Sequence, residues 1–193
     1  MSLLYTTISQ AVNPAVSVDD CKLDLRIEHA IDDVLILSYI NAASKYASEV
    51  VGRRLISETI KYSIQDFCSV LELPFTPVSE ITEIQYFDAD NVTQTLSITD
   101  FYLYNFDNKT ELVFKADVVI PSVFDRRDAV NISFITGFGA NSSDIPATIT
   151  RAIRLLVAHW YENRSSTIVG FAVNEIPMGV ESMLGSERIG WVA

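Results

Sequence analysis

The stretch GRRLISETIKYSI, residues 52–64, joins a helical pattern to a strand pattern and so decides the fold class. Before it, apolar residues recur every three or four positions. Within it, apolar and polar residues alternate, as in a strand with one buried face. The apolar members are Ile56, Ile60, Tyr62 and Ile64. Gly52 is well placed to end the helix, since glycine adopts the left-handed conformation that helix ends need.

The region before Gly52, residues 17–52, is expected to be helical. Ser17 followed by Asp20 resembles a capping box and predicts the first N-terminus. A break near residue 27 separates this short helix from a longer one over residues 29–51. The apolar stripe of the longer helix is Ile36, Ile40, Ala43, Ala47 and Val50.

The region after Gly52, residues 55–138, is expected to be a β-rich insertion, with a turn at residues 88–91. Further strands are predicted over residues 81–87, 93–98, 101–104, 111–114 and 130–135. A long helix follows over residues 146–164, because Pro146 suits a first helical turn. Residues 177–193 form a tail. The prediction is a single α+β domain over residues 1–193, with the N-terminal helices packed against the late helix and the insertion between them.

Charge and composition exclude several function classes. The 193 residues carry a formal net charge of −11 and have a pI of about 4.5. Such an acidic chain disfavours sequence-specific or backbone DNA binding and docking on an anionic membrane. Cys21 and Cys68 have no metal-ligand spacing, and we expect both to be reduced thiols. The sequence shows no signal peptide and no membrane span, so we expect a protein made in a cytoplasm.

The stretch AHWYENR, residues 158–164, gathers residue types that often do chemistry. His159 and Glu162 share a helix face, and His29 precedes Asp32 and Asp33 in a similar way. Helical di-iron sites place Glu before His, which is the opposite order. The alternative is the polar end of a structural helix. We therefore predict no catalytic residue, no metal and no cofactor.

Two other motifs receive structural interpretations. Gly137-Phe138-Gly139 lies where a dinucleotide-binding loop would lie, but the third glycine position holds Ser142. A chain reversal that needs positive φ is expected instead. The arginine pairs at residues 53–54 and 126–127 are expected to be solvated or salt-bridged corners, or contacts to an acidic partner.

The order of these features resembles the small head–tail connector (adaptor) family of long-tailed bacteriophages and prophages, in its longer branch with a β-rich insertion. The resemblance covers about residues 17–188. It is carried by LRIEH (25–29), DD (32–33), YI (39–40), GRRLI (52–56), LPFTPV (73–78), Ile81, YFD (86–88), FITGFG (134–139), IP (145–146), HWYENR (159–164) and IPMGVESML (176–184). Phe138 departs from the tyrosine that is typical of the family, and the last four residues have no counterpart in it.

The resemblance implies a structural role in virion assembly. Such adaptors form a ring beneath the portal, dodecameric by symmetry with it, and present a surface to the tail or to a head-completion protein. The ring also helps to retain packaged DNA. The resemblance implies assembly in the bacterial host cytoplasm, a place at the virion head–tail interface, and no catalytic role for AHWYENR. Ring formation needs a heterologous interface between subunits.

The tail supplies the candidate interface residues, which are Val180, Met183, Leu184, Arg188 and Trp191. An aromatic anchor at a chain end can dominate a binding energy. The alternative is that this tail completes the core of its own subunit. Three other functions stay open: another phage morphogenesis factor for tail completion or DNA packaging, a small metal-dependent enzyme, and an acidic binding module unrelated to phage.

Overall fold

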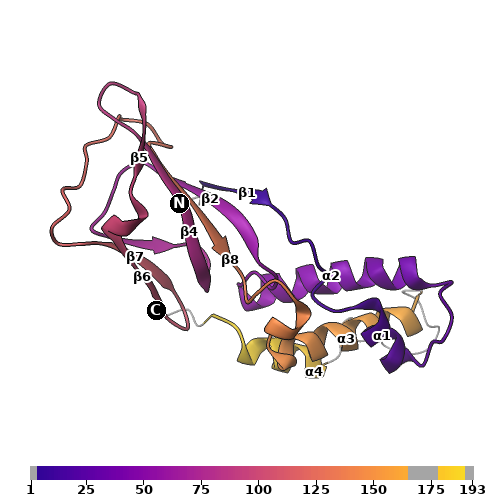
Figure 1. Cartoon of the computed structure of the whole chain (residues 1–193). Helices are drawn as coiled ribbons and strands as arrows, with labels where there is room; N and C mark the ends of the chain where they lie inside the picture. The colour runs from indigo at the N-terminus through magenta and orange to yellow at the C-terminus, as the bar shows by residue number, and fades with distance from the viewer. Residues whose placement is uncertain (1–3, 165–177, 190–193) are drawn as a thin grey trace. The chain divides into compact units, whose positions relative to one another are not determined.

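The computed structural model of the chain describes residues 4–164 and 178–189. Within them the chain forms two compact units, each built from separate segments (Figure 1). The helical unit takes residues 12–56 and the described residues between 139 and 189. The β unit takes residues 4–11 and 57–138. The predicted β-rich insertion between helices is therefore present, and an unpredicted N-terminal strand joins it.

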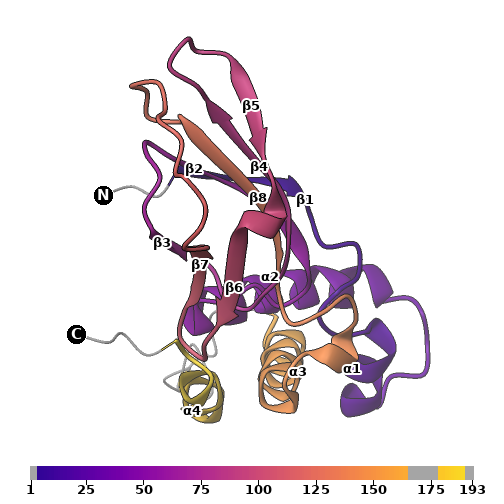
Figure 2. The same cartoon turned by 60° about the vertical axis from the view of Figure 1, so that its left-hand side comes forward.

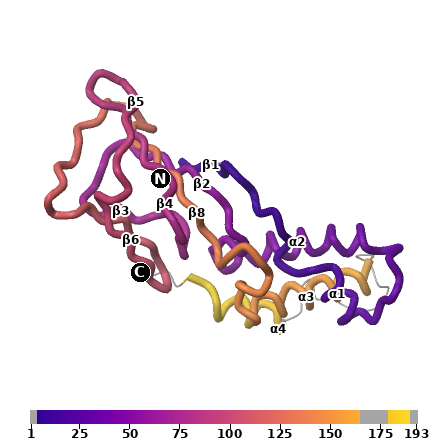
Figure 3. Tube along the Cα trace, viewed as in Figure 1, coloured from indigo at the N-terminus to yellow at the C-terminus, as the bar shows by residue number. Residues whose placement is uncertain are grey.

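The helical unit, over its described residues, contains four α-helices. They are α1 (Val18–Leu25), α2 (Asp33–Val51), α3 (Ala147–Glu162) and α4 (Met178–Ser186), with a 3₁₀ turn, η2 (Ser142–Asp144), before α3. Helix α3 contacts each of the other three. Figure 3 shows α2 and α3 next to one another, in agreement with their contacts. The predicted packing of the N-terminal helices against the late helix is confirmed.

The core of the helical unit lies between the facing stripes of α2 and α3. Four of the five predicted stripe residues of α2 are buried. The fifth is Val51 and not Val50, which is half-buried, because the residue four positions after Ala47 stays on the same helix face. The buried side chains are Ile36, Ile40, Ala43, Ala47 and Val51 from α2, and Ile149, Ala152, Ile153, Leu156 and Val157 from α3.

Local hydrogen bonds fix the ends of the first two helices. The Ser17 hydroxyl oxygen accepts the backbone N–H of Asp20 at 3.0 Å. This bond confirms the predicted N-cap. Gly52 has φ 72° and donates its N–H to Ser48 O at 3.0 Å. It therefore ends α2 as predicted. The start of α2 differs from the prediction. Arg26, at φ 57°, ends α1, and the chain turns before α2 begins at Asp33 instead of near residue 29.

The β unit, over its described residues, contains eight strands in two antiparallel sheets. The strands are β1 (Leu4–Ser9), β2 (Glu58–Ile64), β3 (Val70–Leu73), β4 (Val78–Phe87), β5 (Thr93–Leu96), β6 (Phe101–Asn105), β7 (Thr110–Phe114) and β8 (Val130–Thr136). The five-stranded sheet has the order β1-β2-β8-β4-β5, and the three-stranded sheet has the order β3-β7-β6 (Figure 2).

The core of the β unit is built from residues that alternate along the strands. Ile60 of β2 is paired with Phe134 of β8, which is paired with Ile81 of β4, and all three side chains are buried. Phe101 and Leu112 of the three-stranded sheet belong to the same apolar cluster. The alternation predicted from residue 56 onward is therefore the inward-facing row of a sheet.

Two strands are not predicted from the sequence, and a third is shorter than predicted. Strands β1 and β3 are not predicted. The strand predicted over residues 93–98 ends at Leu96, and a 3₁₀ turn, η1 (Ile98–Asp100), follows. The turn at residues 88–91 is confirmed, because one carboxylate oxygen of Asp88 accepts the N–H groups of Asp90 and Val92, each at 3.0 Å. Such bonds from an Asp side chain to the backbone are typical of turns.

Candidate functional site

The AHWYENR segment ties the end of α3 to the start of α2. The Tyr161 hydroxyl donates a hydrogen bond to the Asp32 carboxylate, and Arg164 Nη2 lies 3.2 Å from the same oxygen. The Arg164 guanidinium also lies over the Tyr161 ring, 4.4 Å from its centroid. This placement allows a cation–π interaction. Because Asp32 is the residue that precedes α2, these contacts hold two helix ends together. The polar cluster acts as a clamp between helices.

His159, the histidine of this stretch, contacts a residue of its own helix end. The Asn163 side-chain nitrogen lies 3.4 Å from His159 Nδ1 and donates to His159 O at 2.9 Å. Next to it, Trp160 meets Tyr39 of α2 edge to face, with ring centroids 6.3 Å apart. In the part of the chain that the structure describes, no three His, Cys, Asp or Glu side chains are grouped to hold a metal ion.

A second clamp joins α1 to α3. Asp24 accepts Arg154 Nε at 2.8 Å and Nη2 at 2.7 Å, and Arg151 Nη1 at 2.9 Å. The two bonds from Arg154 make a bidentate pair, the stronger and more specific form of an ion pair. Arg151 and Arg154 are three residues apart and share one face of α3, so a single carboxylate reaches both. The Lys22 ammonium of α1 adds a pair to Asp33 of α2 at 2.9 Å.

These contacts shift the pKa values of the groups that make them. The hydrogen bond from Tyr161 holds the pKa of Asp32 below its ordinary value of 3.8, and the Arg164 guanidinium acts in the same direction. The same hydrogen bond raises the pKa of Tyr161 above its ordinary value of 10.0. Burial raises the pKa of the Cys21 thiol to about 11. The Asp32–Tyr161 pair therefore keeps its charge state over the whole neutral range.

The glycine and arginine motifs have structural roles. Gly137 has φ 132°, which confirms the predicted reversal. Glycine adopts such a positive φ at little cost. A Cβ on Gly139 would lie 2.3 Å from an Asp144 carboxylate oxygen, so the chain passes that side chain closely. Arg126 binds Asp128 at 2.7 Å and stacks over the Phe87 ring at 3.9 Å, in agreement with a salt-bridged corner.

The predicted interface residues fall into three groups. Val180 and Leu184 are fully buried, and their helix α4 contacts α3 and α2. Met183 is half-buried and Arg188 is exposed. Trp191 lies outside the described residues. The structure thus places Val180 and Leu184 in the core of their own subunit, which is the alternative role. It leaves Met183 and Arg188 as accessible members of the predicted interface.

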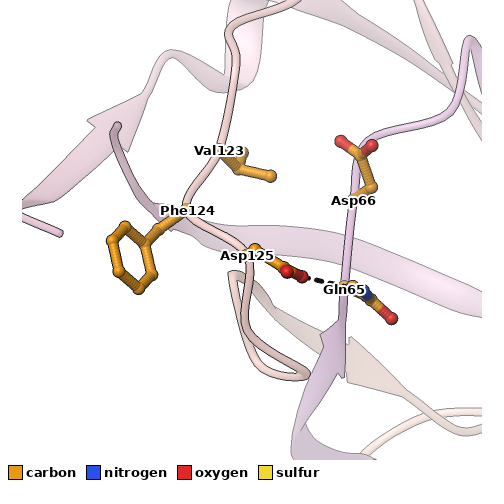
Figure 4. Close-up of a pocket in the computed structure, with 5 residues that line it drawn as sticks. All are labelled: Gln65, Asp66, Val123, Phe124 and Asp125. Carbon is orange, nitrogen blue, oxygen red and sulfur yellow. Dashed lines mark hydrogen bonds between the residues drawn. The ribbon is translucent and has the colours of Figure 1, made fainter. Parts of the chain in front are cut away.

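The β unit has an open pocket of about 360 Å³. Its lining comes from two loops and consists of Gln65, Asp66, Val123, Phe124 and Asp125 (Figure 4). The Gln65 amide donates to an Asp125 carboxylate oxygen at 3.2 Å. Both Asp66 and Asp125 are exposed to solvent.

The two outer edges of the five-stranded sheet, unpaired among the described strands, are not predicted from the sequence. Strand β1 forms one edge and β5 the other, and most residues of both are exposed. The signal that could have indicated β1 is LYTTIS, residues 4–9, which is rich in strand-favouring residues and has no charge. Within the described helices, none is long and apolar enough to cross a membrane.

Comparison with known proteins finds one similar protein family and several similar solved structures. The model of the family described as phage gp6-like head-tail connector protein matches residues 15–100. That range begins just before α1 and runs through β5. No curated protein matches the sequence.

Three solved structures contain a similar chain. The first is the neck of an empty GTA particle computed with C6 symmetry, at 23% identity and a TM-score of 0.78, covering 98% of this chain and 97% of the other. The second is the virion of a native gene transfer agent (GTA) particle, at 22% identity and a TM-score of 0.78, covering 98% of this chain and 97% of the other. The third is the neck of a native GTA particle computed with C12 symmetry, at 22% identity and a TM-score of 0.77, covering 100% of this chain and 98% of the other.

At these identities the solved structures show a shared fold over nearly the whole length of both chains. The family match covers the first two helices and the first half of the β unit. The sequence motifs that resemble a head–tail connector lie on both units. Over residues 15–100, somewhat less than half of the chain, the sequence is similar to the phage head–tail connector family.

Proposed function

We propose that this protein is a structural subunit of the connector between the head and the tail of a phage-like particle, and that it works as a ring. The agreement of two independent comparisons supports the proposal. The connector family model matches residues 15–100, and the fold over essentially the full chain is that of chains in particle necks. Two of those necks are described with sixfold and twelvefold symmetry. Twelve copies around a portal fit the second of these.

The charged side chains of the helical unit support a scaffolding role. Asp24 and Asp32 each bind arginine on or next to α3, so these two carboxylates join helices. Bidentate and shared pairs of this kind fix geometry better than isolated surface pairs. A ring subunit needs such rigidity, because small errors in the subunit would accumulate around a closed ring.

The charge of the β unit supports a place beside packaged DNA. Residues 57–138 contain thirteen Asp and Glu residues against five Lys and Arg residues, which gives a net charge of −8. An acidic surface repels the phosphate backbone and lets DNA pass without binding. We propose the portal protein and a tail or head-completion protein as the partners, and retention of packaged DNA as a second role of the ring.

Deletion of the gene from the phage or prophage that encodes it tests the proposal. Electron microscopy of lysates is expected to show separate DNA-filled heads and tails, and the protein supplied in trans is expected to restore joined particles. Heads without DNA would favour a packaging accessory instead. Tails that are incomplete beside normal heads would favour a tail-completion factor. Particles joined as in the parent would refute the connector role.

A further inference from the structure

We propose that neighbouring subunits join through the two end strands of the five-stranded sheet, with β1 of one subunit pairing in parallel with β5 of the next. The inference rests on the proposed ring function and names the surfaces that would build the ring. A ring of identical subunits needs two different surfaces on each subunit that fit one another. The two ends of one sheet provide such a pair.

Strand β1 is an open edge whose protection is limited to an irregular register, or β-bulge, between Thr7 and Ser9. It pairs with β2 on one side, and in the described residues no strand pairs with its other side. Its sequence, LYTTIS, contains no charged residue and no proline, although 20% of the chain is charged. Exposed edges are commonly guarded by lysine, proline, a bulge or a short length, and β1 has neither lysine nor proline. Here the side chains of Leu4 and Ile8 are 53% and 58% exposed.

Strand β5 is the matching edge at the other end of the sheet. It pairs with β4 alone among the described strands, and its sequence, TQTL, is also uncharged. Val92 and Ile98, which flank it, are 54% and 45% exposed. The β unit as a whole is strongly acidic, so uncharged edges such as these two let copies of this chain approach with little charge repulsion.

The directions of the strands decide how the edges would pair. Each neighbour pair in the sheet is antiparallel, so β1, β8 and β5 run in one direction and β2 and β4 in the other. The rotation that relates neighbouring subunits in a ring can extend the sheet of one subunit into the sheet of the next while the strand directions are kept. β1 then meets β5 of the neighbour in parallel. A twofold dimer would instead bring β1 against β1 in an antiparallel pair.

Two threonines mark the same face of this sheet at its two edges. Thr6 is paired with Lys61, and Lys61 with Ser133. Thr95 is paired with Gln85, and Gln85 with Asn131, which is two residues from Ser133 and so on the same face. Both threonines are exposed. Cysteines at these positions would lie within disulfide reach in the register that sets Thr6 opposite Thr95.

Cysteine cross-linking of the full-length protein tests this pairing. The background carries Cys68→Ser, because Cys68 is exposed while Cys21 is buried. Thr6→Cys and Thr95→Cys are made as separate proteins and oxidised alone and mixed. We expect covalent dimers in the mixture and not in either protein alone. A chain carrying both substitutions is expected to give a ladder of larger covalent species. Leu4→Cys in place of Thr6→Cys allows for a register two residues away.

Each other outcome has a definite meaning. Dimers formed by Thr6→Cys alone, as abundant as those in the mixture, would overturn the proposal in favour of a twofold pair. Rings seen by electron microscopy without any cross-link in the mixture would also overturn it, while the connector function would stand. The absence of both rings and cross-links at every protein concentration would count against both proposals.

A charge at the edge gives a second readout that needs no disulfide. Thr6→Lys and Thr95→Lys are each expected to raise the protein concentration needed for ring assembly on the order of tenfold or more, because lysine is a typical guard of edge strands. Gln85→Lys adds the same charge on the same face of an interior strand and is the matched control. Equal effects from all three variants, with unchanged melting, would mean that general charge and not the edge controls assembly.

Discussion

Arg154 of α3 binds the Asp24 carboxylate of α1 through two nitrogens, at 2.7 and 2.8 Å, across 130 residues of sequence. The neighbouring Arg151 reaches the same carboxylate at 2.9 Å. These bonds join the first and third helices of the helical unit. Most of the β unit lies between these two helices in the sequence. The ion pairs thus close a long loop at the polar rim of the helical core.

Replacement of Asp24 tests this closure. Asp24→Asn is expected to lower the free energy of unfolding by about 1 kcal/mol, because it removes a carboxylate shared by two arginines on a partly exposed surface. Urea denaturation measures the change. Glu28→Gln removes the same charge at an exposed position just beyond α1 and is the control. Equal losses in the two variants would show that the bidentate geometry contributes nothing.

The hydrogen bond from Tyr161 to Asp32 predicts a pH window. Asp32 has a lowered pKa in the folded protein, so its contribution is present above about pH 3.8 and is lost as the pH falls through the folded pKa. Tyr161 has a raised pKa, so its contribution is present below about pH 10.0 and is lost as the pH rises through the folded pKa. Tyr161→Phe should therefore destabilise the protein between these limits.

Melting curves of the wild type and Tyr161→Phe between pH 3 and pH 11 check this window. The difference in Tm is expected to be largest near neutral pH and to shrink at both ends. Tyr39→Phe, which keeps a ring against Trp160 and lacks contact with Asp32 among the described bonds, is the control. A difference that stays constant over the whole range would mean that the ionisation of Asp32 has no part in it.

Substitution by alanine is expected to have opposite effects on stability at two glycines. Gly139→Ala would place Cβ within 2.5 Å of three Asp144 side-chain atoms, so Asp144 must move and release the Asn141 N–H that it accepts at 2.9 Å. A loss of about 1–3 kcal/mol is expected, as for other overpacked sites. Gly185 lies in α4 with nothing within 4 Å of an added Cβ. Gly185→Ala is expected to gain up to about 1 kcal/mol through helix propensity.

Thermal denaturation of both variants measures these changes, and each serves as the other's control. Loss in Gly139→Ala together with gain in Gly185→Ala would agree with the geometry. A neutral Gly139→Ala would show that the loop before α3 relaxes freely around Asp144.

The regular parts of the fold are predictable from the sequence because their patterns are local. The stripe of α2 repeats along the whole helix, and β2 alternates over its whole length, so period alone identifies both. Strand β1 carries no such pattern. LYTTIS becomes a strand through its pairing with residues 59–63, which lie far later in the chain. Strand β3 is short, and its pairing with β7 stabilises it.

The site is less predictable because its partners are distant in sequence. Asp32 and Tyr161 each fit the polar end of a helix, and the stretch AHWYENR is interpreted in that way. Their meeting depends on how α2 packs against α3, which sequence spacing does not reveal. The same holds for residues 180–184, where a short apolar segment could serve equally as an exposed anchor or as core.

Leu184 decides between these two roles of α4. Its side chain is fully buried, and the Ile189 N–H after the helix donates to Val51 O at 3.0 Å, which fastens the helix to the end of α2. Leu184→Ala should therefore lower the free energy of unfolding by about 2–5 kcal/mol, the usual loss for a large buried aliphatic side chain. Urea denaturation measures this loss. Truncation after Ile176 would remove Val180 as well and should lower the melting temperature further.

Met183, at a half-buried position on the same helix, supplies the matched control for Leu184. Met183→Ala is expected to cost much less stability, because less of its side chain leaves water on folding. If α4 also meets a partner, Met183→Ala and Arg188→Ala should weaken ring assembly or portal binding at unchanged melting temperature. A Leu184→Ala protein that melts normally but fails to assemble would show that α4 is an anchor for a partner and not part of its own core.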